Sequence, residues 1–185
     1  WNRNLDTLSA HQPDKVAEEL ILIKKTKIDV ILWQDPKITH TTRDTLIQTF
    51  KDYWGGQKME DKLWTGPKEM PNSKRHGIWV LVHSKWVGRI KEWITDDTNF
   101  ARYGGVVLEG SVTKNGTVPR RLGLVSTYSP PIESKNSKWI MNKIGGKNTK
   151  AVLEKLMDDL STLEFKYKNK KVDMVYSGDF NATWN

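Results

Sequence analysis

The sequence has 185 residues, enough for one domain with a hydrophobic core and too few for two comfortable ones. Its 37% of hydrophobic and 28% of charged residues exclude a disordered chain, no apolar run approaches the roughly 20 residues of a membrane-spanning helix, and the lack of cysteine excludes disulfides and thiolate metal sites. The net charge of +8 favours a polyanionic partner, although many basic proteins of this size bind no nucleic acid.

The N-terminal stretch gives an expectation about location. The sequence begins WNRNLDTLSAHQ, without the apolar core of a secretory signal peptide and without an initiator methionine. We therefore expect an intracellular protein, with the nucleus as one candidate compartment. We also expect the chain to be a fragment or a processed form of a longer one.

Two helices and a strand are expected in the first third of the chain. Apolar residues at spacings of four and three predict a helix over residues 13–27. The run IDVILW predicts a buried strand over residues 28–33, and a second helix is expected over residues 41–54, ended by a glycine pair. The apolar faces of the two helices consist of Val16, Leu20, Ile23, Leu46, Phe50 and Trp54.

The rest of the chain has a more β-like pattern. Short apolar runs predict strands in KLWTG, GIWVLVHSKW, RIKEWI, YGGVVLEGSV and RRLGLVSTY, with surface loops over residues 55–62 and 69–77. The Asn-Gly pair in residues 114–117 predicts a hairpin turn. A helix over residues 148–164 and a strand in KVDMVYSGDF follow, so the element order predicts one α/β sandwich domain with mixed strands.

Two acids are the main candidates for chemistry. Asp35 follows the run IDVILW, and Asp179 follows the final apolar run. Sites in α/β proteins gather where strands end, so neighbouring strands would bring both carboxylates into one crevice. Asn2 and Asn4 would add amide oxygens, and this hard-oxygen set suits Mg²⁺ or Mn²⁺ better than zinc. An acid after a strand is also a common turn residue or helix N-cap, and Pro36 is itself a turn signal.

Other candidate groups have weaker patterns. The four histidines lack metal-ligand spacing, and the sequence has no nucleotide-binding glycine motif. A Ser-His-Asp catalytic triad remains an alternative, although the G-x-S-x-G motif that usually carries its serine is absent. The stretch NSKRHG offers Lys74, Arg75 and His76 as phosphate contacts, with Asn4 as a further substrate-binding candidate, although such a run is often only a solvated loop. The nine tryptophans could stack on bases, but most of them are expected in the core.

Four motifs resemble the endonuclease/exonuclease/phosphatase superfamily. They are WNRN (1–4), ILWQD (31–35), STYSPP (126–131) and GDFNA (178–182), in the order in which the family has them. The segments QDPKITHTTRDTL and GIWVLVHSKW resemble most closely the endonuclease domains of LINE-type (non-LTR) retrotransposons. The resemblance covers nearly the whole chain.

The resemblance implies a four-layer α/β sandwich, in which two mixed β-sheets are flanked by helices. It implies Mg²⁺-dependent (or Mn²⁺-dependent) phosphodiester cleavage of nucleic acid, with DNA favoured over RNA. Carried over by motif, Asn2 and Asp35 hold the metal, and Asp179 orients and activates the attacking water. Asn181 and Tyr128 contact the scissile phosphate, whose transition state gathers negative charge.

The sequence departs from the family pattern in three ways. Asp35 stands where the family usually has glutamate, and Pro131 stands where its nuclease branch often has asparagine. The family's final third, with a terminal Ser-Asp-His motif, has no counterpart, since the last histidine is His83. We therefore expect a domain incomplete at the C-terminus, weakly active or inactive as this chain alone, that self-associates or binds a protein partner through the incomplete sheet. The alternative is a catalytically degenerate member that serves as a structural or partner-binding module.

Overall fold

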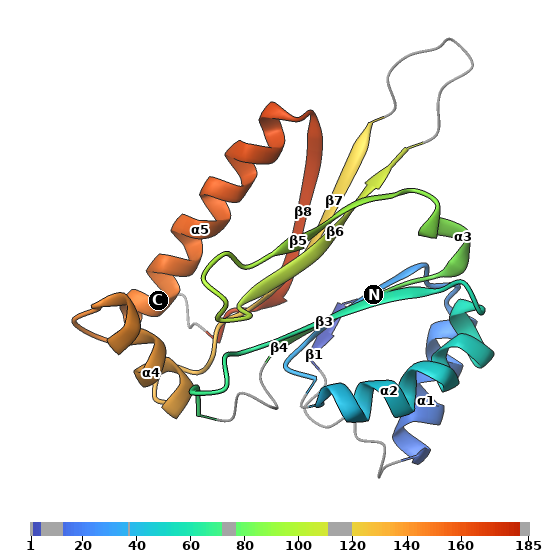
Figure 1. Ribbon diagram of the computed structural model, residues 1–185, viewed down its shortest axis with the longest axis horizontal. Helices are drawn as coiled ribbons and strands as arrows, with labels where there is room; N and C mark the ends of the chain where they lie inside the picture. Colours follow the sequence, from blue (N-terminus) through green and yellow to red (C-terminus); the bar gives the residue numbers. More distant parts are fainter. Residues whose placement is uncertain (1, 5–12, 37, 72–76, 111–119, 182–185) are drawn as a thin grey trace.

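The structure is a computed structural model that describes residues 2–4, 13–36, 38–71, 77–110 and 120–181 (Figure 1). Within these ranges, the strands form two sheets of four strands each. The first sheet has the spatial order β1 (Asn2–Asn4), β2 (Val30–Gln34), β4 (Gly77–Val82) and β3 (Glu60–Thr65). The second has the order β5 (Ile90–Thr95), β6 (Tyr103–Glu109), β7 (Arg121–Tyr128) and β8 (Val172–Asp179).

Both sheets are mixed, as predicted. The pairs β1–β2 and β7–β8 are parallel, and the other neighbouring pairs are antiparallel. Because β3 and β2 are both antiparallel to β4, they run in the same direction, and by the same argument β5 runs with β7. The carboxyl ends of β1, β2 and β3 therefore lie at one edge of the first sheet, and those of β5, β7 and β8 at one edge of the second.

Helices cover the outer face of each sheet (Figure 1). α1 (Pro13–Lys25) and α2 (His40–Phe50) cover the first sheet, and α2 continues into a short π-helical segment, η1 (Lys51–Gly55). α5 (Lys150–Asn169) covers the second sheet, α4 (Lys135–Ile144) packs beside it, and α3 (Ser84–Val87) is a single turn after β4. The order helix, sheet, sheet, helix confirms the predicted four-layer sandwich. Among the described residues, no helix is both long and apolar enough to cross a bilayer.

The alternation of side chains along β2 explains why the sheets pack on both faces. Ile31 and Trp33 point to the helices, where Trp33 lies 5.3 Å from Phe50 and 5.2 Å from Trp79 between ring centroids. Leu32 points the other way, into the layer between the sheets. All six residues of β4 are buried, as expected for a strand covered on both faces.

The predicted helices over residues 13–27, 41–54 and 148–164 are confirmed by α1, α2 with η1, and α5. The surface loop predicted over residues 55–62 is wrong in its second half, because β3 already begins at Glu60 and pairs with β4. The strand expected in GIWVLVHSKW ends early, because His83 accepts a hydrogen bond from the backbone nitrogen of Lys85 and starts α3.

One helix was not predicted at all. α4 begins after Ser134, whose hydroxyl accepts a hydrogen bond from the backbone nitrogen of Ser137 at 3.1 Å, and it ends at the left-handed Gly145. In its sequence KNSKWIMNKI, Ile140 is buried, and Trp139, Met141 and Ile144 pack beside it. The hairpin turn predicted at residues 114–117 and most of the loop predicted over 69–77 lie outside the described residues.

Candidate active site

Two motif residues from different sheets meet at one edge of the sandwich. Asp35 directly follows β2, has a positive φ of 42°, and donates its backbone N–H to the carbonyl oxygen of Gly77 at 2.9 Å. Tyr128 is the last residue of β7, and its hydroxyl donates to Oδ2 of Asp35 at 3.2 Å. The two residues are 93 positions apart, so the fold alone brings them together.

The end of β8 completes the arrangement. Asp179 is the last residue of β8 and lies beside Tyr128 in the parallel register, and its carbonyl oxygen accepts the backbone N–H of Ser129 at 2.9 Å. Asn181, with a φ of 44°, donates its backbone N–H to Oδ1 of Asp179 at 3.0 Å. The side-chain nitrogen of Asn181 donates to the carbonyl oxygen of Ser129 at 2.7 Å. These bonds hold the segments after β7 and β8 together.

Two further hydrogen bonds join the sheets at the same edge. The buried Gln34 donates from Nε2 to the hydroxyl of Ser126 at 2.7 Å, one residue before Asp35. The indole nitrogen of Trp64 donates to the hydroxyl of Thr95 at 3.1 Å, near the ends of β3 and β5. We call the edge where β2, β3, β5, β7 and β8 end the carboxyl edge of the sandwich.

Asp35 and Asp179 both lie at the carboxyl edge, but they do not come from neighbouring strands as expected. Neighbouring strands of a single sheet would have brought them together, but β2 and β8 belong to facing sheets. Tyr128 connects them, because it is hydrogen-bonded to Asp35 and lies beside Asp179 in the register.

The remaining predicted site residues are located less fully. The backbone of β1 pairs Asn2 with Leu32 and Asn4 with Gln34, so Asn4 lies next to the end of β2. Lys74, Arg75 and His76 lie outside the described residues. Their assignments as metal and substrate contacts stay predictions.

The donor chemistry at the carboxyl edge fits one kind of metal site. In the part of the chain that the structure describes, no three acidic, histidine or cysteine side chains cluster closely enough to hold a metal. Mg²⁺ usually takes one or two carboxylates and fills its other positions with water and substrate oxygens. One carboxylate at this edge, that of Asp35, fits such an open site better than a closed cage.

Sequence reasoning assigned no role to five residues of this edge, namely Gln34, Trp64, Thr95, Ser126 and Ser129. Gln34 had a usable signal, because a polar residue inside an otherwise apolar strand must find a hydrogen-bond partner when it is buried. Ser129 contributes through its backbone, and no residue type predicts that contribution.

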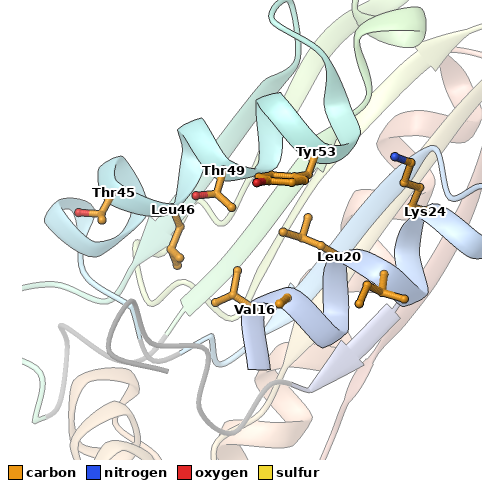
Figure 2. Close-up of a pocket in the computed structure, with 9 residues that line it drawn as sticks. Val16, Leu20, Lys24, Thr45, Leu46, Thr49 and Tyr53 are labelled. Carbon is orange, nitrogen blue, oxygen red and sulfur yellow. The ribbon is translucent and has the colours of Figure 1, made fainter. Parts of the chain in front are cut away.

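An apolar hollow on the helical side lies away from this chemistry. A pocket of about 530 Å³ opens between α1 and α2, with Leu20, Leu46 and Tyr53 among its lining residues (Figure 2). It has Lys24 as its one charged lining residue among those described and contains no acid. We therefore do not assign the chemistry to this pocket.

Comparison with known proteins gives structural but not sequence relatives. No family profile matches the chain, and no curated protein matches it. Among solved structures, sphingomyelinase C from Streptomyces griseocarneus superposes with a TM-score of 0.57 at 15% identity, over 98% of this chain and 63% of that one.

Two other solved structures give the same result. A humanized TDP2 from D. rerio matches with a TM-score of 0.52 at 13% identity, over 98% of this chain and 61% of that one. The human Nocturnin catalytic domain, solved with a bound sulfate anion, matches with a TM-score of 0.52 at 13% identity, over 92% and 58%. This chain thus spans about three fifths of the length of these structures. At such identities the likeness concerns the fold alone, and it agrees with the four-layer α/β sandwich that the resemblance of the motifs implies.

Proposed function

We propose that this chain carries a Mg²⁺-dependent phosphodiester hydrolase centre that cleaves nucleic acid, DNA in preference to RNA, as a retroelement-type endonuclease does. The observation that carries the proposal is the hydrogen bond between Tyr128 and Asp35. It joins two of the four family motifs across the sandwich, beside the strand end that bears the GDFNA motif.

Each residue of the carboxyl edge has its own proposed role in the reaction. Asp179 takes the proton of the attacking water, and the backbone N–H of Asn181 on its Oδ1 fixes the direction of the carboxylate. The side-chain amide of Asn181 has a second N–H besides the one bound to Ser129, and this N–H donates to a phosphate oxygen. Tyr128 donates its one hydroxyl proton to Asp35 in this structure, and it would turn from Asp35 to a phosphate oxygen as negative charge develops there.

Asp35 and Asn2 are the proposed metal ligands. A bound Mg²⁺ or Mn²⁺ supplies positive charge next to the phosphate oxygens. Asp35 is one methylene shorter than the glutamate usual in the family. Its carboxylate accepts the hydroxyl of Tyr128, and its backbone is held by the bond to Gly77.

Charge supports nucleic acid as the substrate class. The chain has 30 Lys and Arg against 22 Asp and Glu, which attracts a polyanion and favours binding by counterion release. Because one structural neighbour is a sphingomyelinase, a phosphocholine lipid is the control substrate of choice. Turnover of the lipid without turnover of DNA would overturn the assigned substrate class.

A degenerate, partner-binding module is the second candidate function. It is favoured by the internal hydrogen bonds of both proposed phosphate donors. The hydroxyl of Tyr128 donates to Asp35, and one side-chain N–H of Asn181 donates to the carbonyl oxygen of Ser129. A scaffold would keep such internal bonds for stability alone.

The first prediction tests the proposed function directly. Supercoiled plasmid is incubated with enzyme in excess, because weak turnover is expected, with Mg²⁺ present or withheld. We expect Mg²⁺-dependent nicking that Asp179→Ala reduces by at least about a hundredfold, as loss of a general base requires. Asp173→Ala is the matched control, because Asp173 lies on the same strand with a 66% exposed side chain.

Two outcomes would decide against the proposal. Nicking that survives in Asp179→Ala or without a divalent cation would remove Asp179 from the chemistry. A folded chain that nicks neither DNA nor RNA under these conditions would favour the degenerate module.

A further inference from the structure

A second hollow lies at the carboxyl edge and has no role in the mechanism above. It measures about 360 Å³ and opens between the ends of β3 and β5. We call it the β3–β5 pocket. The lining residues on which the argument depends are His40, Trp64, Thr65, Thr95, Asn99 and Ala101.

The β3–β5 pocket is connected to the candidate active site through short backbone paths. Thr65 pairs in register with Gly77, whose carbonyl oxygen accepts the backbone N–H of Asp35. On the other sheet, Arg102 follows the pocket residue Ala101, and its carbonyl oxygen accepts the backbone N–H of Tyr128 at 2.7 Å. Two strand spacings separate β3 from β2, so the pocket lies roughly 10 Å from Asp35.

That separation matches the dimensions of a nucleic-acid strand. Consecutive phosphates of a duplex strand advance about 3.4 Å along the helix axis. An unpaired strand is more extended, so a strand whose scissile phosphate lies at Asp35 and Tyr128 would bring a base two or three nucleotides away, or fewer, to the β3–β5 pocket.

The charge of the pocket selects which part of a nucleotide it can receive. Its described lining residues include no lysine or arginine. The one carboxylate, Asp96, is buried and accepts the backbone N–H groups of Thr98 and Arg102, each at 2.9 Å. The buried guanidinium of Arg102 lies 3.7 Å from it and balances its charge. Such a pocket suits an uncharged polar group. A phosphate would find no lysine or arginine in it, and His40 is the only basic side chain among the described lining residues.

The walls of the pocket are suited to a base. Leu63, Trp64 and Pro67 form apolar lining, while Asn99 and Thr95 provide amide and hydroxyl groups. An asparagine amide both donates and accepts hydrogen bonds, which is the pattern that a base edge requires.

The loop that carries Asn99 is held in place before any ligand arrives. Arg102 donates to Asp159 of α5 at 2.5 Å, which ties the loop to the helix layer. The backbone N–H of Asn99 donates to the carbonyl oxygen of Asp96 at 3.0 Å, and Asn99 has a φ of 60°. A preformed loop loses little conformational freedom on binding.

We propose that the β3–β5 pocket is a base-binding subsite, which receives the base of a nucleotide two or three positions, or fewer, from the cleaved phosphate. The inference rests on the proposed function, since it takes the substrate to be a nucleic-acid strand. It adds a base contact to a centre whose other assigned contacts are to phosphate, and so gives the enzyme a means of sequence preference.

The test combines changes in the protein with changes in the substrate. Fluorescence anisotropy measures binding of labelled single-stranded DNA in the Asp179→Ala background, with an abasic nucleotide placed at each position in turn. One position should weaken binding to the parent protein about tenfold, the usual effect of losing one stacked base. Asn99→Gly and His40→Ala should weaken binding of intact DNA and abolish the penalty at that position. Asn99→Gly keeps the positive φ.

The control and the contrary outcomes separate the subsite from the function. Asn142→Ala, at an exposed position of α4, should keep both the affinity and the abasic penalty. If the parent protein nicks plasmid but Asn99→Gly and His40→Ala keep its abasic profile, the subsite is overturned and the function stands. If the parent neither binds nor nicks nucleic acid, the function is overturned and the subsite with it.

Discussion

At the residue scale, unusual backbone angles gather at the carboxyl edge. Six described residues other than glycine have a positive φ. Lys27 and Lys171 follow the ends of α1 and α5, where such angles are common, but the other four are Asp35, Ala101, Asn99 and Asn181. A positive φ costs free energy for residues with a side chain, so hydrogen bonds such as that from Asp35 to Gly77 must hold it.

The hydroxyl of Tyr128 gives the second prediction. Tyr128→Phe removes the hydroxyl that lies against Asp35 and that is proposed to turn to the phosphate, and should lower the nicking rate about a hundredfold, the usual effect of losing one donor to a developing negative charge. Tyr176→Phe is the matched control, since its hydroxyl only reaches the carbonyl oxygen of Leu160 at 3.5 Å. Equal rates for the two variants in a single-turnover nicking assay would remove Tyr128 from the chemistry.

Three other tyrosines give the third prediction, a loss of stability in alkali. Burial raises the pKa of Tyr103, Tyr167 and Tyr176 to about 12, with nearby Asp96, Glu92 and Glu164 adding to the effect in turn. The unfolded chain releases these protons near pH 10.0 and the folded protein only near pH 12, so stability is complete below the first value and lost as the pH rises to the second. Urea unfolding midpoints should fall as the pH rises across this range. In the folded protein, the tyrosinate absorbance of these residues should appear near pH 12 and not near pH 10.0. Midpoints that stay constant would contradict it.

At the element scale, the ends of two helices give a matched pair of glycines. Gly145 ends α4 with a φ of 68°, and Gly88 ends α3 with a φ of −63°. A Cβ added at either position meets no atom within 4 Å, so only the backbone angle differs.

The fourth prediction follows from this pair. Gly145→Ala should lower the free energy of unfolding by about 1 kcal/mol, because the left-handed angle is unfavourable for alanine. Gly88→Ala should raise it by roughly 0.4–1 kcal/mol, because alanine fits the angle and restricts the unfolded chain. Urea unfolding measures both, and a change of the same sign in the two variants would contradict the argument.

The elements also show how far the sequence alone could lead. α1, α2 and α5 were predictable because their apolar residues repeat with the helical period, as Leu156 and Leu160 do. α4 was missed although Ser134 and Gly145 are start and stop signals, because its ten residues hold only about three turns of the apolar pattern. Asp35 and Asp179 were predicted as site residues, but the contact between Asp35 and Tyr128 joins facing sheets, and no local pattern encodes such a pairing.

At the scale of the whole molecule, the two sheets are joined unequally. At the carboxyl edge, hydrogen bonds from Gln34, Trp64 and Tyr128 cross from one sheet to the other. At the opposite end, where β2 and β7 begin, a hollow of about 570 Å³ separates the sheets, with Trp86 and Leu124 in its lining. The site lies at the end where the sheets are tied.

The net charge gives the fifth prediction. With +8 charges overall, the chain should bind DNA partly through phosphate contacts, and two such contacts predict a roughly tenfold loss of affinity between about 50 and 200 mM salt. Fluorescence anisotropy across this range checks it. Asn99→Gly should keep the same salt slope as the parent, because the β3–β5 pocket has no lysine or arginine among its described lining residues. An affinity independent of salt would exclude the electrostatic contribution.

The bond between Tyr128 and Asp35 links the candidate active site to the thickness of the sandwich. Its donor and acceptor belong to different sheets, so their separation is set by the side chains packed between the layers, among them Val80 and Val106. A larger or smaller residue at these buried positions would change the gap between the sheets, and with it the width of the site, without touching any group that meets the substrate. In this molecule the volume of the inner core thus sets the width of the candidate active site.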